Sequence, residues 1–234
     1  MNSVTIQKAT GATAALGSFI ARGVDFASGA RIEADGSIKA IIVQDIGGMT
    51  DISITGSLGS LSARNIGGGF NLAVTDDLVR LAAFSMGTNA NISAGDRIAA
   101  LGVTRGIVEA RINAGAAGIG TISLGCLKSS VIAAVGSIGG VRVNGDMHAS
   151  SIAANIGAGA NGKYGESPTD DVVLDSSLVG AIRSLTVRGK LEGSSDPSNH
   201  FGIVADGQIG RILVGGRRLL PTVLGNITIA ANWR

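Results

Sequence analysis

A four-residue phrase returns along this chain at a fixed distance, and this repeat constrains the fold more than any other feature. The phrase reads RIEA at 31–34, NISA at 91–94, RINA at 111–114 and SIAA at 151–154. Its second position advances in steps of 20 residues through one aliphatic series: Ile32, Ile52, Leu72, Ile92, Ile112, Ile132 and Ile152. The phrase returns after longer gaps at Ile203 and Ile227. A period of this size is typical of stacked repeats.

Two further apolar phrases keep the same period. The second carries apolar residues at its first, fourth and sixth positions, as in LGSLSA (58–63), IGTISL (119–124) and IGRILV (209–214). The third is weaker and is marked by Phe26, Ile46, Ile66, Ile107, Leu127, Met147 and Leu191. Apolar residues two apart share one face of a strand, whereas a helix would place them about 200° apart. Each unit therefore predicts three short strands separated by corners rich in Gly, Ser and Asn.

The repeat predicts an all-β fold, a parallel β-helix (β-solenoid) with three sheets. We expect coils of roughly 20 residues, about nine to ten of them, in a single domain over 1–234 with regular coils at 16–154. The isoleucine ladder then forms one inner edge of the coil. With 3% aromatic and 45% hydrophobic residues, small aliphatic side chains can fill a narrow interior. We attribute the Gly at the second position of many LGSLSA-type phrases to the backbone angles of a tight corner.

Several classes of protein fit the sequence poorly. Nineteen basic and seventeen acidic residues leave a net charge of +2, and the arginines that follow the second phrase (Arg22, Arg64 and Arg188) form no continuous ladder. This argues against a nucleic-acid partner. No apolar run is long enough to span a membrane, and no secretory signal is visible. Cys126 is the only cysteine and the two histidines are far apart, so we expect no disulfide, metal site or cofactor.

Two excursions interrupt the period, at about 155–175 and 192–202. Together they hold the only tyrosine and a local excess of acids. Loops that leave a rigid scaffold are where binding or catalysis is added. The candidate loop site therefore comprises Tyr164, Glu166, Asp170, Asp171, Asp196 and His200. Adjacent carboxylates such as Asp170 and Asp171 point opposite ways in a strand, and no calcium-loop spacing is present, which favours ordinary solvated loops.

Copies of the pattern IGxLxVxGxIxxSxIxA, best seen at 138–154, resemble the glycine-rich β-helix repeats of large bacterial surface or secreted proteins, such as those abundant in planctomycetes. The resemblance covers about residues 16–234. It implies a right-handed parallel β-helix and an extracellular or cell-surface setting, and it implies no common activity. The chain departs from this pattern in showing no signal peptide and no capping element, so we expect it to be part of a longer repeat array.

Three functions remain open at this stage. The first is a non-catalytic structural or adhesive solenoid, whose partners are its own copies or neighbouring repeats stacked end to end. The second is a polysaccharide-active enzyme or carbohydrate-binding module similar to the pectin-lyase-like proteins, but few aromatic residues are present to stack on sugars. The third is a filament similar to the bactofilins, whose windings are shorter than 20 residues. We expect the first function and no enzymatic activity, with a polysaccharide kept open as a partner.

Overall fold

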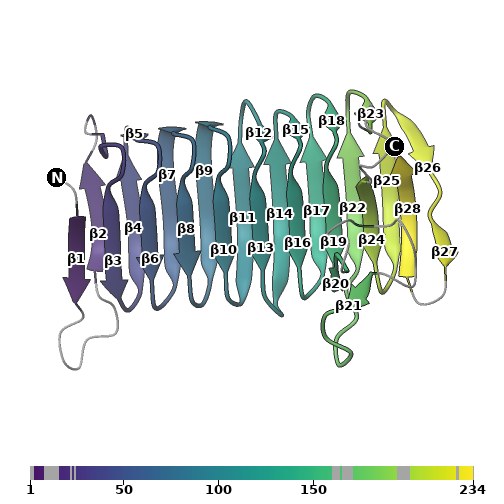
Figure 1. Ribbon diagram of the computed structural model, residues 1–234, viewed down its shortest axis with the longest axis horizontal. Helices are drawn as coiled ribbons and strands as arrows, with labels where there is room; N and C mark the ends of the chain where they lie inside the picture. Colours follow the sequence, from purple (N-terminus) through teal and green to yellow (C-terminus); the bar gives the residue numbers. More distant parts are fainter. Residues whose placement is uncertain are drawn as a thin grey trace.

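The computed structural model describes residues 3–7, 16–21, 23, 25–159, 164, 171–193, 201–224 and 227–233. This part of the chain consists of strands and their connections and contains no helix. The strands lie across the long axis of the molecule, and successive coils stack side by side along it (Figure 1). The predicted all-β parallel solenoid is confirmed.

Sheet A carries the isoleucine ladder on its inner face. Its 11 strands are, in spatial order, β1 (Ser3–Gln7), β3 (Arg31–Asp35), β6 (Asp51–Ile54), β8 (Asn71–Val74), β10 (Asn91–Ala94), β13 (Arg111–Ala114), β16 (Val131–Ala134), β19 (Ser151–Ala154), β24 (Phe201–Ala205), β28 (Ile227–Trp233) and β27 (Thr222–Leu224). Parallel pairing places the seven residues from Ile32 to Ile152 directly above one another. Ile32 is 6% exposed and the other six are fully buried.

Sheet B forms the opposite long side and contains the second phrase. Its main path runs through β2 (Leu16–Ala21), β4 (Ile38–Val43), β7 (Leu58–Ile66), β9 (Leu78–Met86), β11 (Arg97–Val103), β14 (Gly118–Leu124), β17 (Ile138–Val143), β22 (Ile182–Val187), β25 (Ile209–Val214) and β26 (Arg217–Leu219), and β5 (Asp45–Ile46) pairs with β7 beside it. The three apolar positions of the phrase point inward, as Leu58, Leu61 and Ala63 do in β7.

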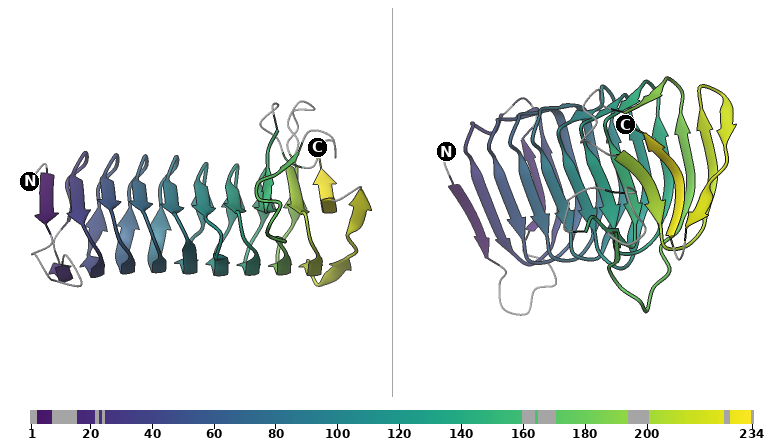
Figure 2. Two further views of the ribbon diagram at one scale, coloured as in Figure 1. Left: turned by 90° about the horizontal axis from the view of Figure 1, so that it is seen from below. Right: turned by 45° about the vertical axis from the view of Figure 1, so that its right-hand side comes forward.

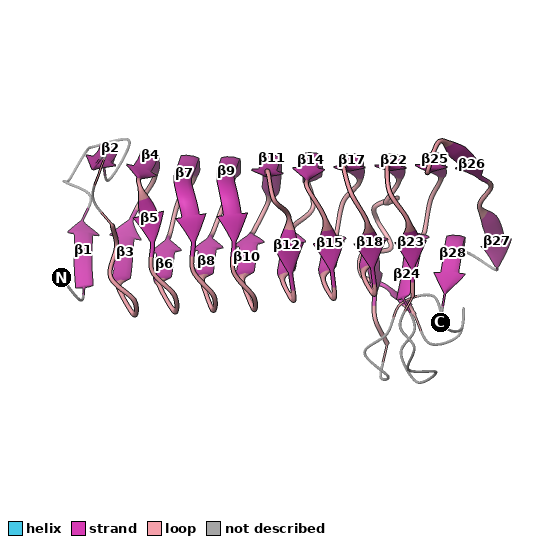
Figure 3. Cartoon of the chain, turned by 90° about the horizontal axis from the view of Figure 1, so that it is seen from above, coloured by secondary structure: helices cyan, strands magenta, loops and turns pink. Residues whose placement is uncertain are grey.

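The third side of the coil is narrow and is divided in two. Sheet C joins β12 (Ile107–Val108), β15 (Leu127–Lys128), β18 (Met147–His148) and β23 (Leu191–Glu192), which form one row in Figure 3. In the earlier coils this side is formed by β5 and by the far ends of β7 and β9, where Ile66 pairs with Ile46 and Met86. Within the described chain, no strand pairing joins the Met86 end of β9 to β12.

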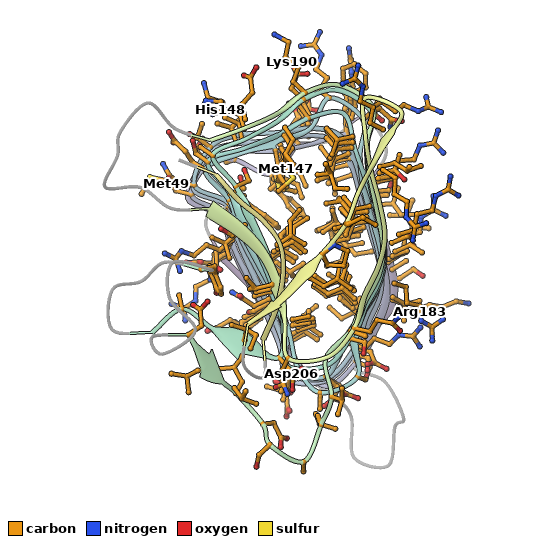
Figure 4. The ribbon with its side chains drawn as sticks, turned by 90° about the vertical axis from the view of Figure 1, so that its right-hand side faces the viewer. Met49, Met147, His148, Arg183, Lys190 and Asp206 are labelled. Carbon is orange, nitrogen blue, oxygen red and sulfur yellow. The ribbon has the colours of Figure 1, made fainter. Side chains whose placement is uncertain are left out.

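One continuous core fills the space between the three sides. Figure 4 looks along the axis and shows Met147 pointing into this core from sheet C, while Met49 points out at a corner. The core consists almost entirely of Ile, Leu, Val and Ala, and Phe70 is the fully buried aromatic residue among the described side chains. Burying this aliphatic surface at about 25 cal/mol per Å² is the main force that holds the coils together.

The glycines of the second phrase have a different cause from the one expected. A Cβ added at Gly59, Gly120 or Gly210 would lie 2.3 Å from a carbonyl oxygen of the preceding coil. None of these glycines has a positive φ angle. The explanation by backbone angles is therefore wrong at these positions. Glycine is needed there because adjacent coils approach too closely for a side chain.

The regular solenoid has about seven turns, slightly fewer than the nine to ten coils expected. The difference arises at the ends, where the period changes. Val4 pairs with Ile32 and Ile152 pairs with Ile203, so the first coil and the coil with the long excursion exceed 20 residues. The phrase at Ile227 does not add a parallel coil, because β28 runs antiparallel to β24.

At the C-terminal end of the solenoid the pairing changes from parallel to antiparallel. In sheet B, β26 folds back antiparallel on β25, and in sheet A, β27 and β28 are antiparallel partners. The reversal lies at the end of the stack that Figure 2 colours yellow. The outermost strand of sheet B carries Arg217 and Arg218, and charged residues of this kind hinder the pairing of an edge strand with another chain.

Candidate functional site

The loop site expected from the sequence lies only partly in the described chain. Tyr164 and Asp171 belong to the described residues, whereas Glu166, Asp170, Asp196 and His200 lie outside them. The ends of the first excursion form a short antiparallel pair, β20 (Ile156–Gly157) with β21 (Val172–Val173). This pair protrudes from the side of the rod in Figure 1.

Tyr164 packs on the outside of sheet A. Together with Val131 and Val173 it covers a second small core of fully or nearly buried residues, Ala133, Ala153, Ile156 and Val204. Burial raises the pKa of the Tyr164 phenol, and the nearby Arg111 guanidinium partly offsets this rise. Asp171 is also buried. A phenol that keeps its proton and packs on aliphatic side chains serves to attach the excursion to the sheet.

Asn155 anchors the start of the excursion, and no sequence motif marks it. Its side-chain amide donates to the carbonyl oxygens of Asp175 and Leu178, at 2.7 and 3.1 Å, and to Asp206 Oδ2 at 2.8 Å. Its Oδ1 accepts the Asp175 N–H at 2.9 Å. Asn155 is fully buried, and this set of bonds satisfies every donor and acceptor position it needs. Its only signal in the sequence is its place at the first break of the period.

The carboxylates at this junction bind backbone groups of the chain. Asp206 Oδ1 accepts the Gly180 N–H at 2.6 Å. Asp175 accepts the Ser177 hydroxyl and the Ser177 N–H, and these two bonds lower the pKa of its carboxyl. Asp206 thus holds the segment before β22 against the β24–β25 connection, and Asp175 holds a local turn of the excursion.

A second candidate site is a shallow groove on the outer face of sheet B. One outward-facing position of the sheet B strands lies in register from coil to coil and forms a column along the rod. Over four coils the residues of this column are small: Ser62, Ala82, Gly102 and Ser123. Larger residues stand on either side of this column, so that a depression of about 440 Å³ runs across β7, β9, β11 and β14. Arg80 lines one side, and Phe84, Thr104 and Asn144 line the other.

The groups at the rim of this groove are held in place by their neighbours. The Arg105 guanidinium lies over the Phe84 ring, 5.2 Å from its centroid, within the range of a cation–π contact. Arg142 Nε donates to Asn144 Oδ1 at 3.1 Å. The groove thus offers arginines, an exposed ring edge, hydroxyls and an amide. These are groups that bind a polar, anionic ligand and that have no acid–base chemistry of their own at neutral pH.

The described residues contain no group of three or more His, Cys, Asp or Glu side chains placed to hold a metal ion. Nor do they include a helix with the length and apolarity needed to cross a membrane.

Comparison with protein-family models, with curated proteins and with solved structures finds no match to this chain. The fold and the two sites above are therefore the basis for its function.

Proposed function

We propose that this chain is a non-catalytic structural or adhesive β-solenoid, a segment of a bacterial surface or secreted protein. The observation that supports it most is the continuous core, which joins Ile32 near one end to Ile212 near the other in a single cluster. A rod of this kind gains stability from every coil and needs no other partner to remain straight. The bacterial surface setting rests on the resemblance of the repeats.

The use of polar side chains supports a structural role. Those at the corners satisfy backbone groups of neighbouring coils, as when the Ser130 hydroxyl accepts the Ala110 N–H at 3.0 Å and Ser150 accepts the Ser130 N–H at 3.1 Å. The described acids of the excursion are likewise engaged with backbone groups or buried. In this arrangement the side chains that could perform chemistry maintain the rod.

The two ends of the solenoid differ in their capacity to extend. Within the described chain, β1 and β2 each pair on one side only, so their other edges present backbone donors and acceptors. At the opposite end the chain reverses and places Arg217 and Arg218 on the edge strand. We infer that copies or neighbouring repeats add at the β1–β2 end, because unpaired edges are templates for another strand.

Light scattering on the isolated chain tests this function. We expect concentration-dependent association that is lost in Ile20→Lys, which puts a charge on the exposed face of edge strand β2. Val79→Lys is the matched control, because Val79 has a similar exposure but lies on the inner strand β9. A chain that stays monomeric, or that associates equally in both variants, would contradict end-on addition. Turnover of a polysaccharide that Asp170→Asn abolishes would replace the structural role with a catalytic one.

A further inference from the structure

The charges of this chain are distributed very unevenly between its faces. The strands of sheet B contain no Asp or Glu along the main path from β2 to β26, yet they hold nine of the nineteen basic residues: Lys39, Arg64, Arg80, Arg97, Arg142, Arg183, Arg211, Arg217 and Arg218. The rest of the chain is left with ten basic and seventeen acidic residues. The small net charge of +2 therefore conceals one strongly basic side.

All nine basic side chains are exposed. In Figure 4 the labelled Arg183 projects away from the core, and nitrogen-bearing side chains of other coils gather along the same side. The ion pairs found in the described chain, Arg31 with Glu33 and Lys190 with Glu192, lie elsewhere and involve none of the nine. An uneven distribution of this kind gives the face a positive potential, which attracts an anionic partner.

The groove described above lies within this basic face and follows the axis of the rod. Its small residues come from consecutive coils, and the next residue of the same column is Arg142. Arg80 lies on the side of the groove three strands earlier, so the strands that carry Arg80 and Arg142 lie about 14 Å apart along the axis at ~4.8 Å per strand. Arg183 and Arg211 continue the basic residues on the next two strands.

We propose that the outer face of sheet B binds an acidic polysaccharide, with the sugar chain laid along the axis of the solenoid. Arginine forms paired hydrogen bonds with carboxylate and sulfate groups. The hydroxyls of Ser62, Thr104 and Ser123 and the amide of Asn144 are suited to sugar hydroxyls. One sugar residue of an extended chain is close in length to one coil, so charges on the two chains can match over several repeats.

A nucleic acid fits this face less well. Proteins that bind single strands stack bases on several aromatic side chains, and the strands of sheet B present Phe84 as their one exposed aromatic residue, already covered by Arg105. A duplex is read by elements that enter a groove, and sheet B is broad and carries small residues where such an element would project. The proposal of a polysaccharide partner rests on the adhesive role in the proposed function.

Binding of alginate, a polyuronate, to the full chain tests the proposal, with neutral dextran and a DNA duplex as reference ligands. We expect the double variant Arg80→Ser, Arg142→Ser to lower the affinity for alginate at least about tenfold, equivalent to about 1.4 kcal/mol. The control, Arg111→Ser with Lys128→Ser, removes the same charge from sheets A and C. We expect it to change the affinity less than about twofold, which corresponds to ~0.4 kcal/mol.

Several results would overturn the proposal: no binding to alginate, equal loss in both double variants, equal binding to dextran, or tighter binding to the DNA duplex. Light scattering on the same samples separates this inference from the proposed function. If the chain associates end to end but binds no alginate, the structural role is supported and the binding site is contradicted. If the chain binds alginate without associating, the binding site is supported and end-on addition is contradicted.

Discussion

At the scale of the residue, one corner of the coil controls how the chain turns into sheet A. The last residue of the turn has a positive φ angle in coil after coil, at Gly29, Met49, Gly69, Asn89, Glu109, Ser129 and Ala149. This conformation is strained for side chains other than glycine. The residue that follows points inward and is buried, as Thr50 and Ser130 are. The buried side chain and the backbone hydrogen bonds between coils thus offset the local strain of the corner.

Removing the Ser130 hydroxyl tests how much the buried residue of this corner contributes to stability. Ser130→Ala removes the acceptor of the buried Ala110 N–H, while the Lys128 carbonyl loses a donor at 2.7 Å. A buried backbone group left without a partner costs about 1–3 kcal/mol. We expect a loss of that size in the free energy of unfolding, measured by urea melts. Ser129→Ala makes the same chemical change one residue earlier at an exposed side chain, so its effect should stay below about 0.5 kcal/mol. Equal losses would refute the role of the hydroxyl.

At the scale of the element, the first excursion is attached to the solenoid at two points. Asn155 holds its start to Asp175, Leu178 and Asp206. Tyr164 packs on the outer face of sheet A. The described part of the excursion therefore covers part of the outer face of sheet A.

Titration of Tyr164 reports whether the excursion is in place, since it is the only tyrosine of the chain. Burial raises its pKa above the ordinary value of 10.0. The folded state thus holds the phenolic proton more tightly than the unfolded state. The resulting stabilisation is complete below about pH 10 and is lost as the pH rises through the raised pKa.

Asn155→Gly removes the anchor without adding strain, because Asn155 itself has a φ angle of 55°. We expect the pKa of Tyr164 to fall toward its ordinary value, measured by tyrosinate absorbance. Asn113→Ala, which truncates an exposed asparagine on sheet A, should leave the titration unchanged. An unchanged pKa in Asn155→Gly would show that Tyr164 holds the excursion without Asn155.

The repeated elements were predictable from the sequence, whereas the irregular ones were not. Residues two apart within a phrase, such as Ile52 and Ile54, report strand facing directly, and their period reports stacking. Asn155 was missed because its partners are 20 to 51 residues away and follow no period. The reversal at β28 was missed because Ile227 and Ile229 alternate in the same way whichever direction the strand runs. The basic face was not predicted because its residues are spread over several positions of the repeat and recur at no fixed period.

At the scale of the whole molecule, each coil contacts chiefly the coils next to it, as in other repeat proteins. Sheets A and B continue through all the regular turns with one register. The unit that matters for stability is therefore one complete coil, and removing such a unit should bring equivalent residues back into contact.

Deletion of residues 51–70 tests this modularity. It joins Thr50 to Asn71 and lets β3 pair with β8 and β4 with β9 in the register that β6 and β7 now provide. We expect a folded protein with one cooperative urea transition and a somewhat smaller m value, because less surface is buried. Deletion of 51–60 removes half a coil, puts the ladders out of register and should abolish folding by circular dichroism. A full-coil deletion that unfolds the chain would show that the coils are not interchangeable.

The division of the third side between β9 and β12 has a mechanical consequence. The bonds between coils point along the rod, so a pull on its two ends loads the successive intervals in series, and the weakest interval sets the breaking force. Most intervals are tied on three sides. Between the coils of β9 and β12 only sheets A and B supply strand pairing. A stretched rod should open first where the third side is unpaired in this way, leaving blocks of coils that are still wound and stay joined by the covalent chain.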